Sequence, residues 1–208
     1  LSDADRMNVG KAIPDFYGGI TSNFSYKGFD LSLFGQFSVG GKVMSAWRGV
    51  NGSEGTDHLG LALSNVKVND RGESVEQYFN VSKEVANGYW RGEGTSNTIP
   101  RPVRIGVHTG YDYDYNVQTS TRYLEDASYF KLKTVTLGYT LPESVVKKLR
   151  VNSLRVYVSA DNLLTLTKYS GYDPETSFSG SPGDSNYGVD FGLQPVLRTF
   201  IFGLNLNF

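Results

Sequence analysis

The chain has 208 residues, a formal net charge of -1, no cysteine, and many glycines (24), tyrosines (14) and phenylalanines (12). The lack of cysteine excludes disulfide frameworks, thiolate metal sites and cysteine nucleophiles, and the near-neutral charge gives no reason to expect a nucleic-acid partner. Aromatic residues favour strands and glycine favours turns and bends, so this composition predicts an all-β protein.

The chain opens on LSDADRMNVG, a stretch typical of the middle of a loop, so we expect further residues to precede it. No stretch near this end resembles a signal peptide. No apolar run approaches the ~18 residues that indicate a transmembrane helix.

The first predicted elements are two strands, at about 17–26 and 29–39, joined by a two-residue turn. The turn is Lys27-Gly28, whose glycine can adopt the positive φ that such hairpins favour. Residues that flank the turn share a face, so Tyr26 is expected opposite Phe29. The apolar side chains of both strands then fall on one face of the hairpin: Ile20, Phe24, Leu31, Leu33, Phe37 and Val39.

Residues 40–127 form a long connection that is rich in glycine, asparagine, serine and aspartate and has no sustained period. A loop of this length is uncommon and is usually functional. Within it, KEVANGYW (83–90) is predicted to form a short helical turn. Pro100 and Pro102 exclude a helix from IPRPVRIG.

A third strand is predicted at about 128–141, and its apolar residues from 135 to 141 alternate on one face. Strict alternation would place Lys131 and Lys133 on that same apolar face. Two explanations remain open: a bulge shifts the phase of the strand, or these lysines lie beyond the apolar zone.

Pro142 ends this strand, and ESVVKKL (143–149) is predicted to form one or two helical turns. A fourth strand at about 153–166 alternates well, and a second long loop follows at about 167–196. The terminal strand, at about 197–208, has one wholly apolar face and finishes on Phe208. The apolar faces of these two strands are formed by Leu154, Val156, Val158, Ala160 and Leu164, and by Phe200, Phe202, Leu204, Leu206 and Phe208.

The connections alternate in length: a tight turn, a very long loop, a short helical turn, a long loop. This inequality is typical of an outer-membrane barrel, in which short periplasmic turns alternate with long extracellular loops. The predicted fold class is therefore all-β, with about five antiparallel strands of a transmembrane β-barrel and extracellular loops at 40–127 and 167–196. Five strands cannot close such a barrel, so we expect a fragment or one chain of a larger assembly.

Alternation with one apolar face is equally typical of a soluble β-sandwich, and periodicity alone leaves the two folds open. A sandwich that binds carbohydrate predicts that the apolar faces pack against each other. A passive outer-membrane porin would also satisfy the strand pattern.

Four blocks of sequence follow one another: YGGITSNFSYKGFDLSLFGQFSVGGKV, TRYLEDASYFKLKTVTLGYTLP, LRVYVSADNLLTLTKYSGYDPE and LRTFIFGLNLNF. In combination they closely resemble the C-terminal part of SusC/RagA-family proteins, the TonB-dependent outer-membrane transporters of Bacteroidetes. The likeness covers most of the chain and is weakest in the loop 40–127, although IPRPVR there is similar to a Pro-Arg segment of the family.

The resemblance implies a barrel of about 22 strands with a plugged lumen, and the family's N-terminal plug and TonB box do not appear in this sequence. It implies a nutrient importer of the cell outer membrane, surrounded by lipid, that takes up oligosaccharides or peptides. Energy would come from the TonB complex, and a SusD-like lipoprotein would act as a lid. The resemblance implies neither catalysis nor a cofactor. The final Phe208 resembles the signal that the outer-membrane assembly machinery recognises.

Aromatic side chains of the loops are candidates for substrate contact, because ring faces offer a large contact area to sugars. The alternative is that they pack the loops together or contact the lid. Polar side chains on the strands are expected to face the lumen, where they line the channel or pair with the plug. The loop candidates are Trp47, Trp90, Tyr111, Tyr113, Tyr115 and Tyr172; the lumen candidates are Arg155, Asp161, Asn205 and Asn207.

Asp112, Asp114 and Asn116 could supply oxygen ligands to Ca²⁺, but this segment lacks the sixth-position glycine and the closing glutamate of an EF-hand. We therefore predict no metal site. Asp173 and Glu175 could act as paired catalytic carboxylates only with a pocket and a raised pKa, which nothing in the sequence indicates. An aspartate before proline is typical of a turn, and we predict that the chain is not an enzyme.

Overall fold

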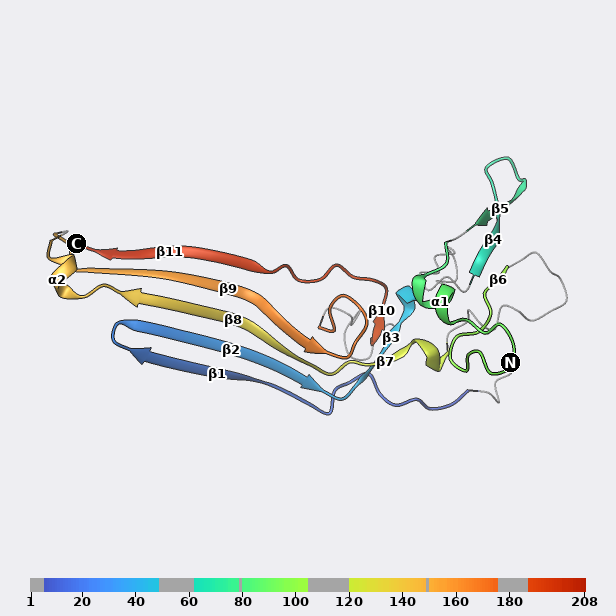
Figure 1. Cartoon of the computed structure of the whole chain (residues 1–208), viewed down its shortest axis with the longest axis horizontal. Coiled ribbons are helices and arrows are strands. Elements are labelled where there is room, and N and C mark those ends of the chain that lie inside the picture. Colours follow the sequence, from blue (N-terminus) through green and yellow to red (C-terminus); the bar gives the residue numbers. More distant parts are fainter. Residues whose placement is uncertain (1–5, 49–61, 79, 105–119, 149, 176–186) are drawn as a thin grey trace. The chain divides into compact units, whose positions relative to one another are not determined.

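The computed structural model describes residues 6–48, 62–78, 80–104, 120–148, 150–175 and 187–208 (Figure 1). The chain divides into two compact units. One, which we call the strand unit, contains Lys11–Lys42, Asp126–Gly188 and Leu193–Phe208. The other, which we call the loop unit, contains the residues up to Gly10 together with Val43–Glu125 and Val189–Gly192. The long connection after the first hairpin, which had no sustained period, thus forms most of a unit of its own.

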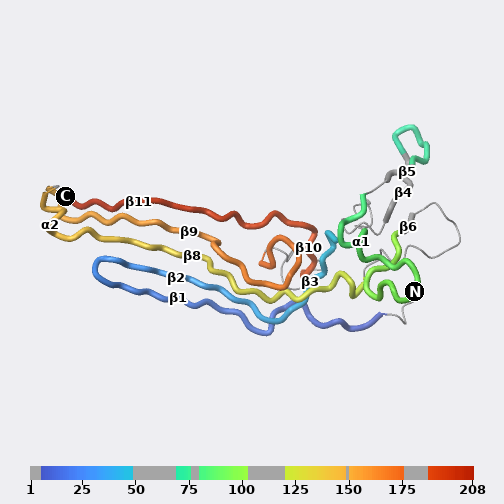
Figure 2. The backbone as a smooth tube through the Cα atoms, viewed as in Figure 1, coloured from blue at the N-terminus to red at the C-terminus, as the bar shows by residue number. Residues whose placement is uncertain are grey.

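The strand unit is one five-stranded sheet in the order β1-β2-β8-β9-β11, and all neighbouring strands are antiparallel. Figure 2 shows the five strands running side by side. Each overlaps one of the five ranges expected from the alternation of apolar residues, and the predicted all-β fold class is confirmed. The strands are β1 (Phe16–Tyr26), β2 (Phe29–Val39), β8 (Tyr129–Thr140), β9 (Ser153–Thr167) and β11 (Thr199–Asn207).

The tight turn between β1 and β2 has the conformation that the sequence predicted. Lys27 and Gly28 both have positive φ, 46° and 87°, which is the pattern of the two-residue turns that suit twisted strands. Tyr26 pairs with Phe29 across it, as expected. The short helix α2 (Glu143–Val146) connects β8 to β9 and confirms the helical turn predicted after Pro142.

A bulge resolves the conflict of phase in β8. Opposite β2, the register shifts between Phe34 and Gly35, because Lys133 is one extra residue in β8. Phe130 and Leu132 therefore pair with Phe37 and Gly35 on the apolar face, and Lys131 moves to the other face. Of the two explanations left open by the sequence, the bulge is correct.

Strand β9 is irregular at the same level. Its register with β8 shifts between Leu132 and Thr134, and Asn162 has a φ of 53°. Bulges add twist and redirect side chains locally. Here two neighbouring strands, β8 and β9, each contribute an irregular residue to the same row of the sheet.

The apolar face of the five-stranded sheet is exposed. Phe202 is 79% exposed, Phe208 is 87% exposed, and Leu166, near the other end of the sheet, is 56% exposed. Among the described residues, therefore, no second layer buries this face as a β-sandwich would require. The soluble sandwich does not describe this sheet.

The loop unit is built mainly from short strands in two three-stranded sheets, ordered β10-β3-β7 and β5-β4-β6. Strands of two to seven residues are too short to give a sustained period, which explains why the sequence did not reveal them. Helix α1 (Lys83–Gly88) confirms the predicted helical turn, and the Ser82 hydroxyl caps it by accepting from the Val85 amide at 3.2 Å. The other elements are β3 (Lys42–Ser45), η2 (Ala46–Arg48), β4 (Ala62–Val68), β5 (Ser74–Tyr78), β6 (Val103–Arg104), η4 (Thr121–Tyr123), β7 (Leu124–Asp126) and β10 (Val189–Asp190).

In the part of the chain that the structure describes, no helix is both long and apolar enough to cross a membrane.

Candidate functional site: the polar face of the sheet

The face opposite the apolar one carries a row of polar side chains on each inner strand, and these rows bond across the sheet. Thr136 and Ser159 share a hydrogen bond of 2.8 Å between their hydroxyls. The Thr134 hydroxyl donates to Asp161 at 3.0 Å, and the Gln36 amide donates to the Tyr129 hydroxyl at 3.2 Å. This face is thus polar and hydrogen-bonded, whereas the opposite face carries mainly aliphatic and aromatic side chains.

An ion pair crosses the polar face near the end that carries α2. The Arg155 Nε donates to Asp30 Oδ1 at 2.9 Å, from β9 to β2, with β8 between them. The intervening residue of β8 is Gly138, and a Cβ there would collide with the guanidinium. Glycine at this position lets the arginine lie flat across the strand, with its guanidinium carbon 5.0 Å from the centre of the Tyr157 ring. Both charged side chains remain partly exposed.

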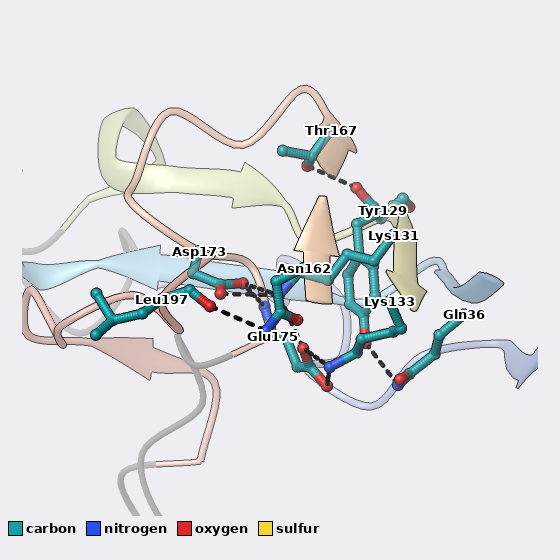
Figure 3. Close-up of polar contacts among 10 residues, drawn as sticks. Gln36, Tyr129, Lys131, Lys133, Asn162, Thr167, Asp173, Glu175 and Leu197 are labelled. Atoms are coloured by element: carbon teal, nitrogen blue, oxygen red, sulfur yellow. Dashed lines mark hydrogen bonds and ion pairs between the residues drawn. The ribbon is translucent and has the colours of Figure 1, made fainter. Parts of the chain in front are cut away.

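A second charged cluster lies at the other end of the polar face, where the chain leaves β9. It contains Lys131 and Lys133 of β8 and two carboxylates of the following loop, Asp173 and Glu175 (Figure 3). The Lys131 Nζ lies 2.6 Å from Asp173 Oδ1 and 2.8 Å from Glu175 Oε2, and the Lys133 Nζ lies 2.6 Å from Glu175 Oε2. We call these four residues the lysine–carboxylate cluster.

The lysine–carboxylate cluster is largely buried. Lys131 is 1% exposed and Asp173 is 6% exposed. A buried charge is tolerated only when it is paired and hydrogen-bonded, which each lysine here achieves through the loop. Burial acts to raise the pKa of Glu175, but hydrogen bonds from Lys131 and Lys133 outweigh it and hold that pKa below its ordinary value of 4.5.

The irregular residues of β8 and β9 both contact the same long connection, 168–198. Lys133 donates from its ammonium to Glu175, while the Asn162 amide donates to the Leu197 carbonyl at 3.2 Å. Figure 3 shows these contacts together with Thr167, whose hydroxyl donates to the Ser128 carbonyl at 2.8 Å. Both the outgoing and the returning stretch of this connection are therefore fastened to the sheet at the level of the bulges.

The structure separates the aromatic candidates. Tyr172 lies in the strand unit, in the segment that carries Asp173, and is 69% exposed. Trp47 and Trp90 belong to the loop unit, where Trp47 is half-buried beside Gly192 and Trp90 is exposed. The remaining three candidates, Tyr111, Tyr113 and Tyr115, lie outside the described residues, as do Asp112, Asp114 and Asn116.

The four lumen candidates share the polar face. Asn205 pairs with Arg155, and Asp161 pairs with Thr199, so the register puts them opposite the apolar row. Asn207 lies on the same face and donates to the Ser153 hydroxyl at 2.7 Å. Their role toward a lumen stays a prediction, as does the assembly role of Phe208.

The sequence analysis missed the lysine–carboxylate cluster, although its parts were visible. Lys131 and Lys133 were noticed as charges in an apolar strand, and Asp173 and Glu175 as an unlikely catalytic pair. Two positive charges that break a pattern, and two negative charges that follow the next strand, could have been joined as partners. Among the described residues, no group of three or more histidine, cysteine, aspartate or glutamate side chains is placed to hold a metal ion.

No family model matches the chain. It is similar over its whole length to TonB-dependent receptors: 34% identical over 212 residues to receptor P3 of Formosa agariphila and 30% identical over 210 residues to receptor P26 of the same species. It is also 26% identical over 210 residues to the TonB-dependent receptor SusC of Bacteroides thetaiotaomicron. The chain spans 18%, 18% and 16% of the lengths of these relatives.

Solved structures share its fold. All of the chain matches 19% of a chain in the RagAB peptide importer in its "closed-closed" state, with a TM-score of 0.68 and 22% identity. The "open-open" state of the same importer matches with a TM-score of 0.62. At this level of identity the likeness concerns the fold, and it places the five-stranded sheet among the strands of a large antiparallel barrel.

Proposed function

We propose that this chain, which is similar over its whole length to TonB-dependent receptors, is a member of the SusC/RagA type of outer-membrane protein in Bacteroidetes and forms part of the barrel wall of a nutrient importer. The imported solute is an oligosaccharide or a peptide too large for passive pores. A SusD-like lipoprotein covers the extracellular side, and the TonB complex supplies energy through a part of the protein outside this sequence.

The observation that carries this proposal is the contrast between the two faces of the sheet. Phe202 and Phe208 expose most of their surface on one face, whereas the other face carries a network of hydrogen bonds and ion pairs. Strands of an outer-membrane barrel need this contrast, because lipid meets one face and an aqueous or protein-filled interior meets the other.

The ends of the sheet support an orientation. The two short connections, the Lys27-Gly28 turn and α2, lie at one end with the C-terminus, and hydrogen bonds such as Thr140 to Gly28 and Asn152 to Asn207 join them there (Figure 1). The long connections leave from the opposite end. Short turns are periplasmic in such barrels and long loops are extracellular, so the lysine–carboxylate cluster lies on the extracellular side.

The edges of the sheet fit a larger barrel. Strands β1 and β11 are its two outer members, and within the described residues neither has a further neighbour. In lipid every backbone group needs a partner, so each edge would pair with a strand from elsewhere in the full protein.

Uptake by cells tests the proposal. The full-length protein and its lid lipoprotein would be produced in a strain that lacks both, and accumulation of labelled oligosaccharides and labelled peptides would be followed. We expect accumulation of one solute class, and its loss when TonB is depleted or when the lipoprotein is omitted. Uptake that persists without TonB would identify a passive porin and overturn the proposal.

A further inference from the structure

The segment 167–175 turns back over the polar face after leaving β9. Thr167 is the last residue of β9 and pairs with Tyr129, while Lys131 lies two rows further into the sheet, opposite Thr165. Asp173 and Glu175 nevertheless reach Lys131, and Glu175 reaches Lys133, which is deeper still. The segment therefore runs back along the sheet instead of continuing away from its end.

The exposure of side chains on the two faces shows which face this segment covers. Lys131 is 1% exposed on the polar face, whereas Leu166 in the next row of the apolar face is 56% exposed. The segment thus covers Lys131 on the polar face and leaves the apolar face open. Tyr169, Asp173 and Pro174 are its buried residues.

The lysine–carboxylate cluster attaches the segment to β8, and its charges are balanced within the cluster. Its two ammonium groups face two carboxylates at 2.6–2.8 Å, so its formal charges cancel. The Asp173 carboxylate also accepts from the Glu175 amide at 3.0 Å, which fixes the turn around Pro174. Removing one member would leave the charges of the buried cluster unbalanced, so the segment is held in one place.

Tyr172 is the large aromatic side chain that stays exposed in this segment, whereas Tyr169 is buried. It directly precedes the buried Asp173 and yet is 69% exposed. A large aromatic side chain on a fixed backbone loses little freedom when it binds, and its hydroxyl can also form hydrogen bonds. The lysine–carboxylate cluster therefore holds the backbone that carries the Tyr172 ring on the polar side of the sheet.

We propose that segment 168–175 folds into the channel, where Tyr172 contacts the passing solute and Lys131 and Lys133 act as positioning residues. This inference rests on the proposed function, because the polar face is the channel side only in a barrel. The solute offers Tyr172 an apolar ring or chain surface together with a polar group for the hydroxyl.

Transport kinetics in whole cells test the contact. In the full-length transporter, Tyr172→Ala should raise the half-saturating solute concentration about fivefold and leave the maximal rate nearly unchanged. Tyr172→Phe keeps the ring and loses only the hydroxyl, so it should raise this concentration less than Tyr172→Ala does. The amount of each variant in the outer membrane would be measured in parallel. An unchanged half-saturating concentration for Tyr172→Ala would overturn the contact.

Cysteine labelling tests the placement, because the chain itself contributes no thiol. A polar, membrane-impermeant maleimide should modify Tyr172→Cys, and saturating solute should slow this reaction. Leu166→Cys is the matched control, since Leu166 lies at the same end of the sheet on the apolar face and should react poorly in the membrane. Adding Asp173→Asn to Tyr172→Cys should abolish the protection by solute, because the segment that carries position 172 is no longer held in place.

The outcomes separate this inference from the proposed function. Rapid labelling of Leu166→Cys would mean that the apolar face does not meet lipid, and the barrel itself would be wrong. Slow labelling of Leu166→Cys with a Tyr172→Cys that solute does not protect would leave the barrel intact and overturn only the inward fold. Protection that survives Asp173→Asn would overturn the positioning role of the cluster.

Discussion

The two charged groups on the polar face differ in what they join and in how deeply they lie. Arg155 and Asp30 connect strands of one sheet and stay partly exposed, while Lys131 and Asp173 connect a strand to a loop and are buried. An exposed pair contributes little, because water already stabilises both charges. A buried pair matters mainly when it is broken, because the remaining charge has no partner. The first group therefore supports a sheet already fixed by its hydrogen bonds, and the second fixes a segment that lies outside the strands of that sheet.

The sharpest test of this comparison is Asp173→Ala. It removes the closest partner of the buried Lys131 ammonium and should lower the free energy of local opening of segment 168–175 by about 3 kcal/mol. Hydrogen exchange of the backbone amides in this segment of the full-length protein would measure the change. Asp30→Ala, the equivalent change in the exposed pair, is the control and should alter exchange in β2 far less. Equal effects of the two substitutions would contradict the comparison.

Low pH should destabilise the attachment of segment 168–175 less than Asp173→Ala does. The pKa of Glu175 is lower in the folded protein than its ordinary value, so its stabilising contribution is complete above that value and is lost as the pH falls through the folded pKa. Amide protection of 168–175 should therefore decrease below pH 4.5 while that of β8 persists.

Lys133→Met should move this loss of protection to higher pH, because one of the two ammonium groups that lower the pKa of Glu175 is gone. Lys147→Met, which removes an exposed lysine of the short connection, is the matched control and should leave the pH dependence unchanged. If Lys133→Met left the pH midpoint of amide protection unchanged, the pKa of Glu175 would not depend on its contact with Lys133.

The smallest effects belong to the exposed pair. Arg155→Gln should lower the thermal stability of the full-length protein slightly, and added salt should reduce the difference. Gly138→Ala should act through the same pair, because its Cβ displaces the guanidinium. A double variant should then be no less stable than the worse single variant, which thermal unfolding in detergent would show. Additive losses would mean that Gly138 has another role.

The sequence was informative about the strands and much less so about how the connections attach to them. Alternation identifies a strand because each buried or lipid-facing position repeats every second residue, and the turn at Lys27-Gly28 further fixed one register. The phase of β8 could not be decided, since an extra residue at Lys133 and an apolar zone that ends early leave the same pattern. The contacts of Asp173 and Glu175 depend on a chain reversal that no local pattern records.

The loop unit illustrates the same limit. Its short strands pair with partners far away in the sequence, as β10 does with β3, where Asp190 is opposite Ser45. Two-residue strands carry no period, so only the folded chain reveals them. The tight turn and the helical turns were accessible by contrast, and α1 formed where its sequence indicated.

The bulge at Lys133 also bears on how this protein can change during evolution. Deleting that one residue would return β8 to strict alternation and would keep Phe130 and Leu132 on the apolar face and Lys131 on the polar face, because Lys133 is the residue without a partner in β2. The same deletion would remove the ammonium group that holds Glu175. The attachment of the loop can therefore weaken at this position while the lipid-facing pattern of the strand is kept. Variation in the loop is expected to accumulate beyond Glu175, where it leaves the lysine–carboxylate cluster intact.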